Sequence, residues 1–256
     1  MYKQCAKYGV EGVSLLGWKL SGIEHNVRYL SEFSWNPTLG AADFYRSYVR
    51  RVYGNGSESI VKVYGDNDAM EPTIPCCLAG LPYPNHFSNG WSVFEPPQLP
   101  ATVEGLSNAE WRRRVAAVPE HAKKLRDMQA TEATSIAALR LAMPKLDAYG
   151  KSQAELLANR FEVRIHYIDV MLAFDELIAA YDATAAKEGI AKARLATAKY
   201  GAKITDSMRE AIEEYAKEIR NRGDVGVVAQ MNEQFYQPVK KFAEDLAKTD
   251  PAGSDK

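Results

Sequence analysis

The chain has 256 residues, almost balanced charge and ordinary hydrophobic content, which excludes several classes of protein. Its 32 Lys and Arg against 33 Asp and Glu give a formal net charge of −1. Nucleic-acid binding needs clustered cations, so we expect no nucleic-acid partner. No stretch approaches the roughly 18 consecutive apolar residues that a membrane-spanning helix needs, so we expect no membrane partner either.

The sequence offers no recognisable motif for a cofactor or a metal. The patterns GxGxxG, GxxxxGK[ST], HExxH and GxSxG do not occur, which leaves dinucleotide binding, phosphate-loop chemistry, zinc proteolysis and the hydrolase elbow without a basis. Cys5, Cys76 and Cys77 show no CxxC spacing, and adjacent cysteines seldom bridge each other. We interpret them as small, partly buried thiols and expect no cofactor and no metal.

The sequence predicts a helix end followed by a short strand in the first 16 residues. Residues 1–8 are typical of the last turn of a helix that closes at Gly9. The run Val10 to Leu16 is apolar without alternation, which predicts a strand buried on both faces, as in a parallel sheet. Such a strand needs neighbours for its backbone groups, and the remaining sequence has almost no strand signal. We therefore expect a portion of a larger protein, or pairing with another chain.

Three helical segments follow the strand. Apolar residues at helical spacing predict a helix from Glu24 to Phe33, which Trp35, Asn36 and Pro37 end. A second amphipathic helix is predicted from Ala41 to Tyr53, with Gly54 as its stop. A short third segment is predicted from Glu58 to Tyr64.

The rest of the chain divides into a loop, a bundle and a tail. Residues 71–106 are rich in proline and aromatic residues, which favours an ordered loop over a surface. Residues 107–249 predict an antiparallel helical bundle, and 250–256 a polar tail. The expected helix starts and boundaries in the bundle are Ser107 or Asn108, Pro119, Pro144, Ser152, Thr205 or Asp206, the turn Asn221–Asp224, and Pro238. The most buried helix is predicted from Ser152 to about Lys187.

Most histidines and carboxylates in the sequence have an ordinary structural interpretation. His166 lies in the most buried predicted helix and is expected to be a hydrogen-bonded core residue, whereas His121 lies among Glu120, Lys123 and Lys124 and is expected on a solvated face. The pair Glu213 and Glu214 is expected at the surface, and the run Arg112–Arg114 on the outer face of a helix start.

The residues that follow the predicted strand are the best candidates for a binding site. Ligands of parallel α/β folds bind outside the carboxyl ends of the strands, where Trp18, Lys19, Glu24, His25 and Asn26 are expected. An indole can stack under a sugar ring, and Glu, His and Asn side chains recognise hydroxyl groups. The alternative is that Trp18 only fills space there and that Glu24 stabilises the start of a helix.

The runs YGVEGVSLLGWK, GIEHNVRYLSEFSWNP and ADFYRSYVRRVYG resemble the last strand and helix of the (β/α)8 barrel of retaining glycoside hydrolases. The closest likeness is to the α-glucuronidase and hexosaminidase types, in which a tryptophan ends the last strand. The resemblance covers about the first 54 residues. It implies a mainly α chain that carries the last strand-helix unit of a barrel, in residues 1–70, before the loop and the bundle.

The same resemblance implies that this chain does not catalyse glycoside hydrolysis on its own. Glycoside hydrolysis needs two carboxyl groups that flank the bond, and such enzymes carry them on earlier barrel strands. We therefore expect the C-terminal part of a carbohydrate-active protein that contributes sugar-binding residues, with the missing N-terminal barrel portion as a partner. A secreted or periplasmic location is what the resemblance implies, although this sequence carries no export signal.

Two alternatives remain open. The first is a self-sufficient helical-bundle interaction protein without enzymatic activity. The second is a complete enzyme with an unfamiliar site, using Glu24 together with Asp66 or Asp68.

Overall fold

A computed structural model describes residues 24–55, 57–70 and 96–248, which are mainly helical. These residues contain no strand. The predicted strand Val10–Leu16 lies outside the described residues, as do Cys5, Cys76 and Cys77 and most of the proline-rich segment. None of the helices within the described ranges is long and apolar enough to cross a membrane.

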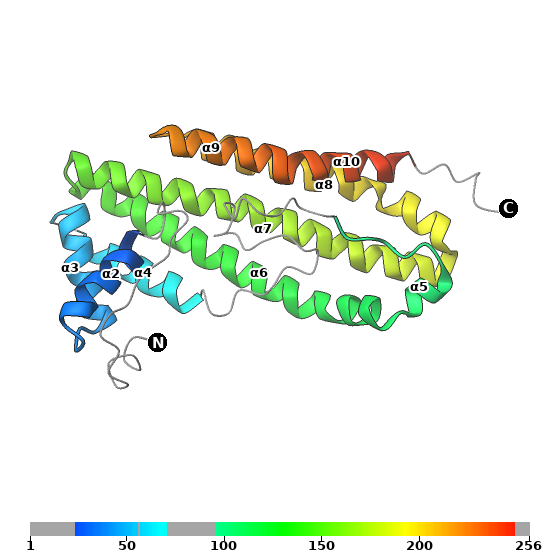
Figure 1. Ribbon diagram of the computed structural model, residues 1–256, viewed down its shortest axis with the longest axis horizontal. Coiled ribbons are helices and arrows are strands. Elements are labelled where there is room, and N and C mark those ends of the chain that lie inside the picture. Colours follow the sequence, from blue (N-terminus) through cyan, green and yellow to red (C-terminus); the bar gives the residue numbers. More distant parts are fainter. Residues whose placement is uncertain (1–23, 56, 71–95, 249–256) are drawn as a thin grey trace. The chain divides into compact units, whose positions relative to one another are not determined.

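The chain forms two compact units, each assembled from two stretches of sequence. The first unit comprises residues 1–69 and 134–160, and the second comprises residues 70–133 and 161–256. Two long helices, α6 (Ala109–Ala142) and α7 (Ala148–Glu188), contribute residues to both units. Figure 1 shows their course in green, with the remaining helices coloured along the sequence.

Helices α3 (Ala41–Tyr53) and α4 (Glu58–Met70) begin at the residues that the sequence predicts, and α2 (Glu24–Trp35) is described from Glu24, where the described residues start. The end of α3 is also confirmed, because Gly54 adopts a φ of 76° and its N–H bonds the carbonyl of Arg50. Helix α2 ends two residues later than predicted. The prediction for α4 was too short, because the GDND sequence continues the helix.

The extension of α4 has a local cause. Asn67 donates from Nδ2 to the carbonyl of Val63 at 2.9 Å, one turn back in the same helix. Lys62 and Asp66 form an ion pair at 2.5 Å with the spacing i, i+4. Both interactions support helix across a sequence whose Gly, Asp and Asn otherwise favour a turn.

The first unit holds one close approach between backbones. The start of α7 passes Tyr53 so closely that a Cβ built on Gly150 would lie 2.4 Å from the carbonyl oxygen of Tyr53. Gly150 N also donates to Asp147 Oδ1 at 2.7 Å, which helps to begin the helix. Only glycine fits this position without moving the backbone.

Replacing Gly150 with alanine should therefore destabilise the first unit. The clash is with backbone rather than with a flexible side chain, so we expect a loss of about 1–3 kcal/mol, as for other overpacked sites. Gly65→Ala is the matched control, since a Cβ there meets nothing within 4 Å in α4; it should be neutral or stabilise by roughly 0.5–1 kcal/mol. Denaturant unfolding of both variants measures the difference, and equal stability would contradict the close approach.

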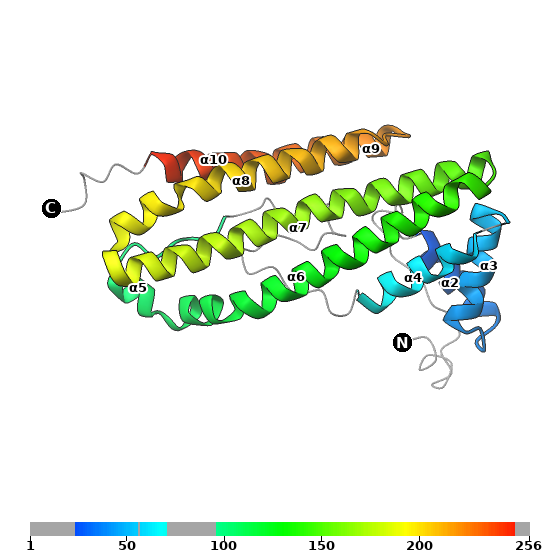
Figure 2. The ribbon, with the colours of Figure 1, turned by 180° about the vertical axis from the view of Figure 1, so that it is seen from behind.

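The second unit is built from α5 (Val103–Ser107), parts of α6 and α7, and a C-terminal series. That series is α8 (Ile190–Ala216), α9 (Arg222–Met231), a π-helical turn η3 (Asn232–Tyr236) and α10 (Gln237–Ala247). Helices α8 and α10 lie side by side in both views (Figures 1 and 2). A Cβ on Gly201 of α8 would lie 2.9 Å from that of Ala243 of α10, so glycine allows this contact.

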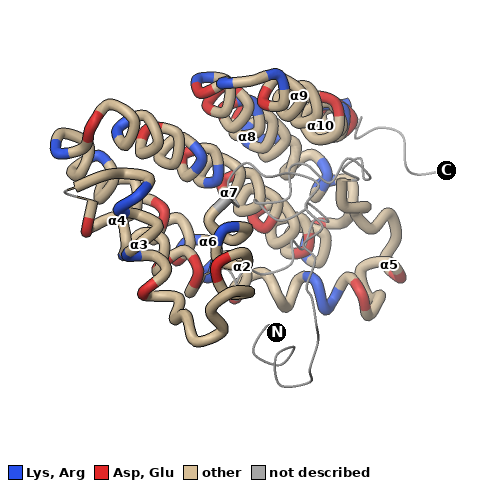
Figure 3. The backbone as a smooth tube through the Cα atoms, turned by 60° about the vertical axis from the view of Figure 1, so that its left-hand side comes forward, with Lys and Arg blue, Asp and Glu red and all other residues tan. Residues whose placement is uncertain are grey.

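The hydrophobic core of the second unit draws on all the long helices. Its fully buried members include the following side chains: Leu125, Tyr167, Ile168, Phe174, Leu177, Ile204 and Met208. The largest share comes from α7, which confirms the prediction that this is the most buried helix. Basic and acidic residues are interspersed along the described helices (Figure 3).

Several predicted boundaries in this region agree with the structure. Asn108 precedes α6 and accepts from Glu110 N at 2.8 Å, as a capping residue does. Pro144 lies in a short 3-10 turn, η2 (Met143–Lys145), between α6 and α7. Pro238 lies in the first turn of α10, directly after the π-helical turn.

Other predicted boundaries were wrong. Helix α7 begins four residues before Ser152, and Pro119 lies inside α6 without ending it. Thr205 and Asp206 lie within α8 rather than at its start. Thr205 Oγ1 donates to the carbonyl of Gly201 at 2.8 Å, a hydrogen bond inside the helix that takes the place of capping.

The turn predicted at Asn221–Asp224 is the start of α9. Asn221 caps the helix and Asp224 bonds back to the N–H of Asn221 at 3.1 Å, which completes a capping box.

Candidate functional site

The predicted sugar-binding residues fall partly inside the described structure. Trp18 and Lys19 lie outside the described residues, and Glu24 is described only as the first residue of α2. His25 is half-buried and Asn26 is exposed, both in the first turn of α2. The geometry of this candidate site therefore rests on His25 and Asn26.

His25 packs against three tyrosines of the first unit. Its ring centroid lies 5.0 Å from that of Tyr64 in an edge-to-face arrangement, and 6.2 and 6.4 Å from those of Tyr45 and Tyr48. Tyr45 and Tyr64 stack on each other at 5.4 Å. We call Tyr45, Tyr48, Tyr53 and Tyr64 the tyrosine cluster. Such packing fixes the imidazole at the edge of an aromatic core.

The hydroxyl groups of the tyrosine cluster are engaged with one another and with one carboxylate. Tyr45 donates to Asp68, and the hydroxyls of Tyr53 and Tyr64 lie 2.8 Å apart. Burial raises the pKa of Tyr64 well above its ordinary value, and the neighbouring tyrosines add to the rise. Tyr64 is therefore protonated at neutral pH and serves as a neutral hydrogen-bonding group.

Sequence reasoning missed the tyrosine cluster. Its members come from α3 and α4, and their spacing within each helix predicts only an apolar face. The excess of aromatic residues with hydroxyl groups on these faces was the one signal that could have drawn attention to them.

The two aspartates considered for an unfamiliar catalytic site both have partners. Asp66 pairs with Lys62, and Asp68 accepts from Tyr45. Another carboxylate of this unit, Glu32, pairs with Arg28 at 2.8 Å and with Arg51 at 2.6 Å. Hydrogen bonds from Arg28 lower the pKa of Glu32, with Arg51 adding to the effect against partial burial. These carboxylates act as structural partners.

The second unit contains a buried histidine–aspartate pair that links α6 to α7. His121 Nδ1 lies 2.6 Å from Asp175 Oδ2, and both side chains are only 3% exposed. The expectation of a solvated His121 was wrong. Its charged neighbours point elsewhere, whereas His121 shares the helix face of Leu125 and Met128, which are buried. Burial raises the pKa of Asp175, while the contact with His121 opposes the rise.

A second buried pair lies further along the same two helices. Arg164 Nη2 lies 2.6 Å from Glu132 Oε1, with side chains 15% and 0% exposed. No donor among the described residues is aligned for a hydrogen bond to either oxygen of Glu132, so the contact is an ion pair without a well-directed hydrogen bond. Burial raises the pKa of Glu132, and Arg164 opposes the rise.

Of the other residues discussed in the sequence, His166 and Glu213 lie nearer the surface, whereas Glu214 is buried. His166 is 30% exposed on its side chain and lies 3.4 Å from Glu210, so the expected core position was wrong. Glu213 is exposed as predicted, but Glu214 is buried and pairs with Lys217. Within the described ranges no three His, Cys, Asp or Glu side chains are grouped so that they could hold a metal ion.

The geometry thus offers a histidine at the edge of a tyrosine cluster in one unit and two buried polar pairs in the other. Both polar pairs are buried between α6 and α7, where the ordinary role of such a pair is to connect two helices. Some of their polar atoms, namely His121 Nε2 and both carboxylate oxygens of Glu132, have no hydrogen-bond partner among the described residues. Of the residues predicted for the sugar site, the structure describes the side chains of His25, which is half-buried, and Asn26, which is exposed. Comparison of the chain with family models, with curated proteins and with solved structures finds no match.

Proposed function

We propose that this chain contributes sugar-binding residues to a carbohydrate-active protein of the glycoside hydrolase kind, without supplying the catalytic carboxylate pair itself. The architecture in this proposal is the last strand-helix unit of a (β/α)8 barrel, a proline-rich ordered loop and an antiparallel helical bundle. The observation that carries it is the position of His25, half-exposed at the start of α2 and supported by tyrosines.

The chemistry of this position suits a sugar. Sugars present C–H faces that pack on aromatic rings and hydroxyl groups that bond imidazole and amide groups. His25 and the exposed Asn26 supply such polar groups on adjacent residues, and His25 follows Trp18, at the end of the predicted strand, by seven residues. The contact with Tyr64 holds the imidazole in place, which limits the entropy lost when a ligand binds.

The interactions of the nearby carboxylates support the proposal that this chain does not supply the catalytic carboxylate pair. Hydrolysis needs two carboxyl groups facing each other across a glycosidic bond, roughly 5–10 Å apart. Glu32, Asp66 and Asp68 are held by basic side chains or by a tyrosine. We therefore propose that the acid and the nucleophile come from a barrel portion that acts together with this chain.

Replacement of His25 with phenylalanine tests the sugar site. The change keeps an aromatic ring against Tyr64 but removes both ring nitrogens. Titration of hexuronates and N-acetylhexosamines into the isotope-labelled chain, followed by NMR, should show millimolar binding that weakens about five- to tenfold in this variant. His166→Phe, a half-exposed histidine of the second unit, should leave binding unchanged.

Two results would count against this function. One is equal sugar affinity of the His25→Phe variant and the parent chain, or no binding by either. The other is robust hydrolysis of aryl glycosides by the purified chain, which would place a complete catalytic site within it.

A second candidate function is a self-sufficient helical interaction module. It is favoured by the core of the second unit, where side chains from α6 to α10 are fully buried against one another. A self-sufficient module should melt cooperatively and stay in solution. A chain that depends on a missing barrel portion should instead bind hydrophobic dyes and aggregate when heated.

A further inference from the structure

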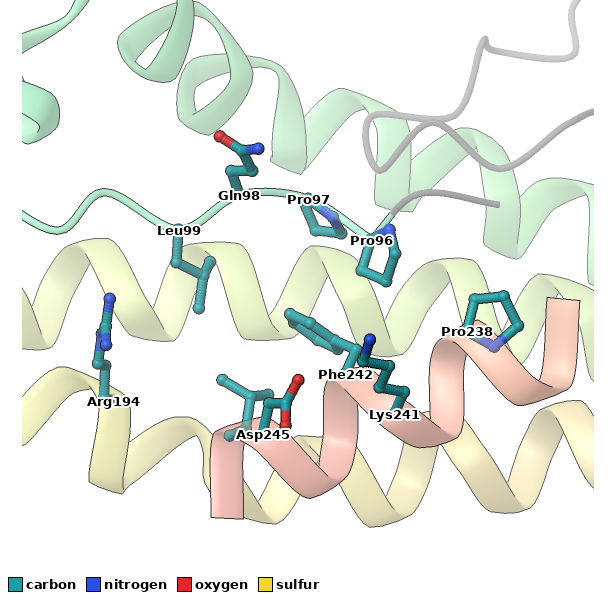
Figure 4. A pocket seen from close by; sticks show the side chains of 10 residues that line it. Pro96, Pro97, Gln98, Leu99, Arg194, Pro238, Lys241, Phe242 and Asp245 are labelled. Carbon is teal, nitrogen blue, oxygen red and sulfur yellow. The ribbon is translucent and has the colours of Figure 1, made fainter. Parts of the chain in front are cut away.

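A groove of about 530 Å³ opens in the second unit between the 96–99 segment and helices α8 and α10. Its walls are mostly apolar, with Pro96, Pro97 and Leu99 on one side and Phe242 of α10 on the other (Figure 4). Leu246 of α10 also lines the groove. A groove of this size is within the range that holds a small organic ligand. It is separate from the sugar site proposed in the first unit.

Two cations flank the apolar walls. Arg194 of α8 and Lys241 of α10 both line the groove (Figure 4). Neither has a carboxylate within 4.0 Å among the described residues. The one acidic lining residue, Asp245, lies 3.6 Å from Lys248, outside the groove lining. The groove therefore carries an excess of positive charge next to an apolar surface.

Arg194 lies near a second polar group of this region. Burial raises the pKa of Tyr181, and the nearby guanidinium of Arg194 opposes the rise. The Tyr181 hydroxyl donates to the carbonyl of Pro100, next to Leu99. Arg194 and Leu99 both line the groove, so this cation lies near the place where the 96–99 segment joins the fold.

We propose that the groove binds an amphipathic monoanion, an aliphatic or aromatic body that carries one carboxylate. The body would pack between Leu99 and Phe242, and the carboxylate would be neutralised by Arg194 and Lys241. A neutral aliphatic molecule would leave both cations unused, and a small hydrophilic anion would leave the apolar walls uncovered. Only a molecule with both features matches the whole lining.

Calorimetric titration of the full chain with decanoate, below its micellar concentration, tests this proposal. Saturable one-to-one binding is expected. Decanol and acetate, which present the apolar body and the carboxylate separately, should each bind at least about tenfold more weakly. No saturable decanoate binding, or decanol binding as tightly as decanoate, would overturn the proposal.

Charge reversal at one lysine locates the site. Lys241→Glu should weaken decanoate binding about tenfold, because the head group would face a like charge. Lys240→Glu makes the same change at the neighbouring exposed residue, which does not line the groove, and should change the affinity less than about twofold. Equal weakening by both variants would indicate a non-specific charge effect and overturn the assignment.

A filling variant gives an independent result. Leu99→Trp places a larger side chain where the aliphatic body would lie, so it should abolish decanoate binding while circular dichroism and melting stay close to those of the parent. Undiminished binding in a folded Leu99→Trp variant would exclude this groove as the site. Since Lys241 is exposed, the charge-reversal result stands even if the filling variant fails to fold.

Discussion

Replacement of Arg164 with methionine should lower the free energy of unfolding by roughly 3–5 kcal/mol at neutral pH, the cost typical of leaving a buried charge unpaired. Glu132 is fully buried, and its one cationic contact in the described structure is Arg164 at 2.6 Å. Methionine preserves much of the aliphatic packing that Arg164 makes beside Phe161, whose ring centroid lies 4.6 Å from the guanidinium carbon. The loss therefore reports on the charge rather than on a cavity.

The pH dependence of this loss follows from the pKa of Glu132. Burial raises it above its ordinary value of 4.5. A carboxyl group whose pKa rises on folding binds its proton more tightly in the folded state. The stability that protonated Glu132 contributes is therefore complete at a pH below the unfolded-state pKa of 4.5. It is lost as the pH rises through the higher pKa of the folded state. Without Arg164 the pKa rises further, so the deficit of the variant should shrink as the medium is acidified.

A double-mutant cycle separates the pair from its surroundings. Combining Arg164→Met with Glu132→Leu should recover most of the lost stability, because two apolar side chains need no desolvation of charge. Arg209→Met is the matched control: Arg209 pairs with Asp206 at 3.0 Å on an exposed face, and its loss should cost less than about 1 kcal/mol. Denaturant unfolding measures all four variants. A cost below that of the control would contradict the buried pair.

The elements that sequence predicts well are those with local signals. Helix α3 begins and ends at the predicted residues, because its apolar face has helical period and Gly54 supplies a left-handed stop. The core position of α7 follows from apolar stripes on two faces. These signals are contained in a few consecutive residues and do not depend on what packs against them.

Predicted helix starts at serine and threonine residues were wrong because the hydroxyl group of these side chains can make two different hydrogen bonds. A threonine or serine can cap a helix, or it can bond the carbonyl four residues back inside one. Thr205 does the second, with Gly201 as acceptor. The two cases have the same sequence, and tertiary packing of the preceding segment, Ile190 to Ile204, decides between them.

In the candidate site, too, the local features were predictable from the sequence and the contacts between helices were not. The place of His25 in the first turn of a helix was predictable from the pattern that follows it. Its neighbours were not, since Tyr45 and Tyr64 come from two other helices and reach His25 only when these pack together. His121 was misplaced because its neighbours in sequence are charged, although the helical period sets it on the face of Leu125.

Replacement of His121 with leucine should destabilise the protein by roughly 2–4 kcal/mol at neutral pH. The change leaves Asp175 buried without the imidazole 2.6 Å away, which alone would cost about as much as the loss of Arg164. It also removes His121 Nε2, a buried nitrogen that has no hydrogen-bond partner among the described residues. Burying such an atom costs about 1–3 kcal/mol, so its removal offsets part of the loss.

Asp175→Asn separates charge from hydrogen bonding at the same place. The amide oxygen can still accept from the imidazole, so this variant should lose only about 1 kcal/mol. His121→Leu should lose less under acid conditions, because burial already raises the pKa of Asp175 above 3.8, and loss of the histidine raises it further. Protonation then removes the unpaired charge. If Asp175→Asn proved the more costly change across this pH range, the expectation that the hydrogen bond matters more than the charge of Asp175 would be refuted.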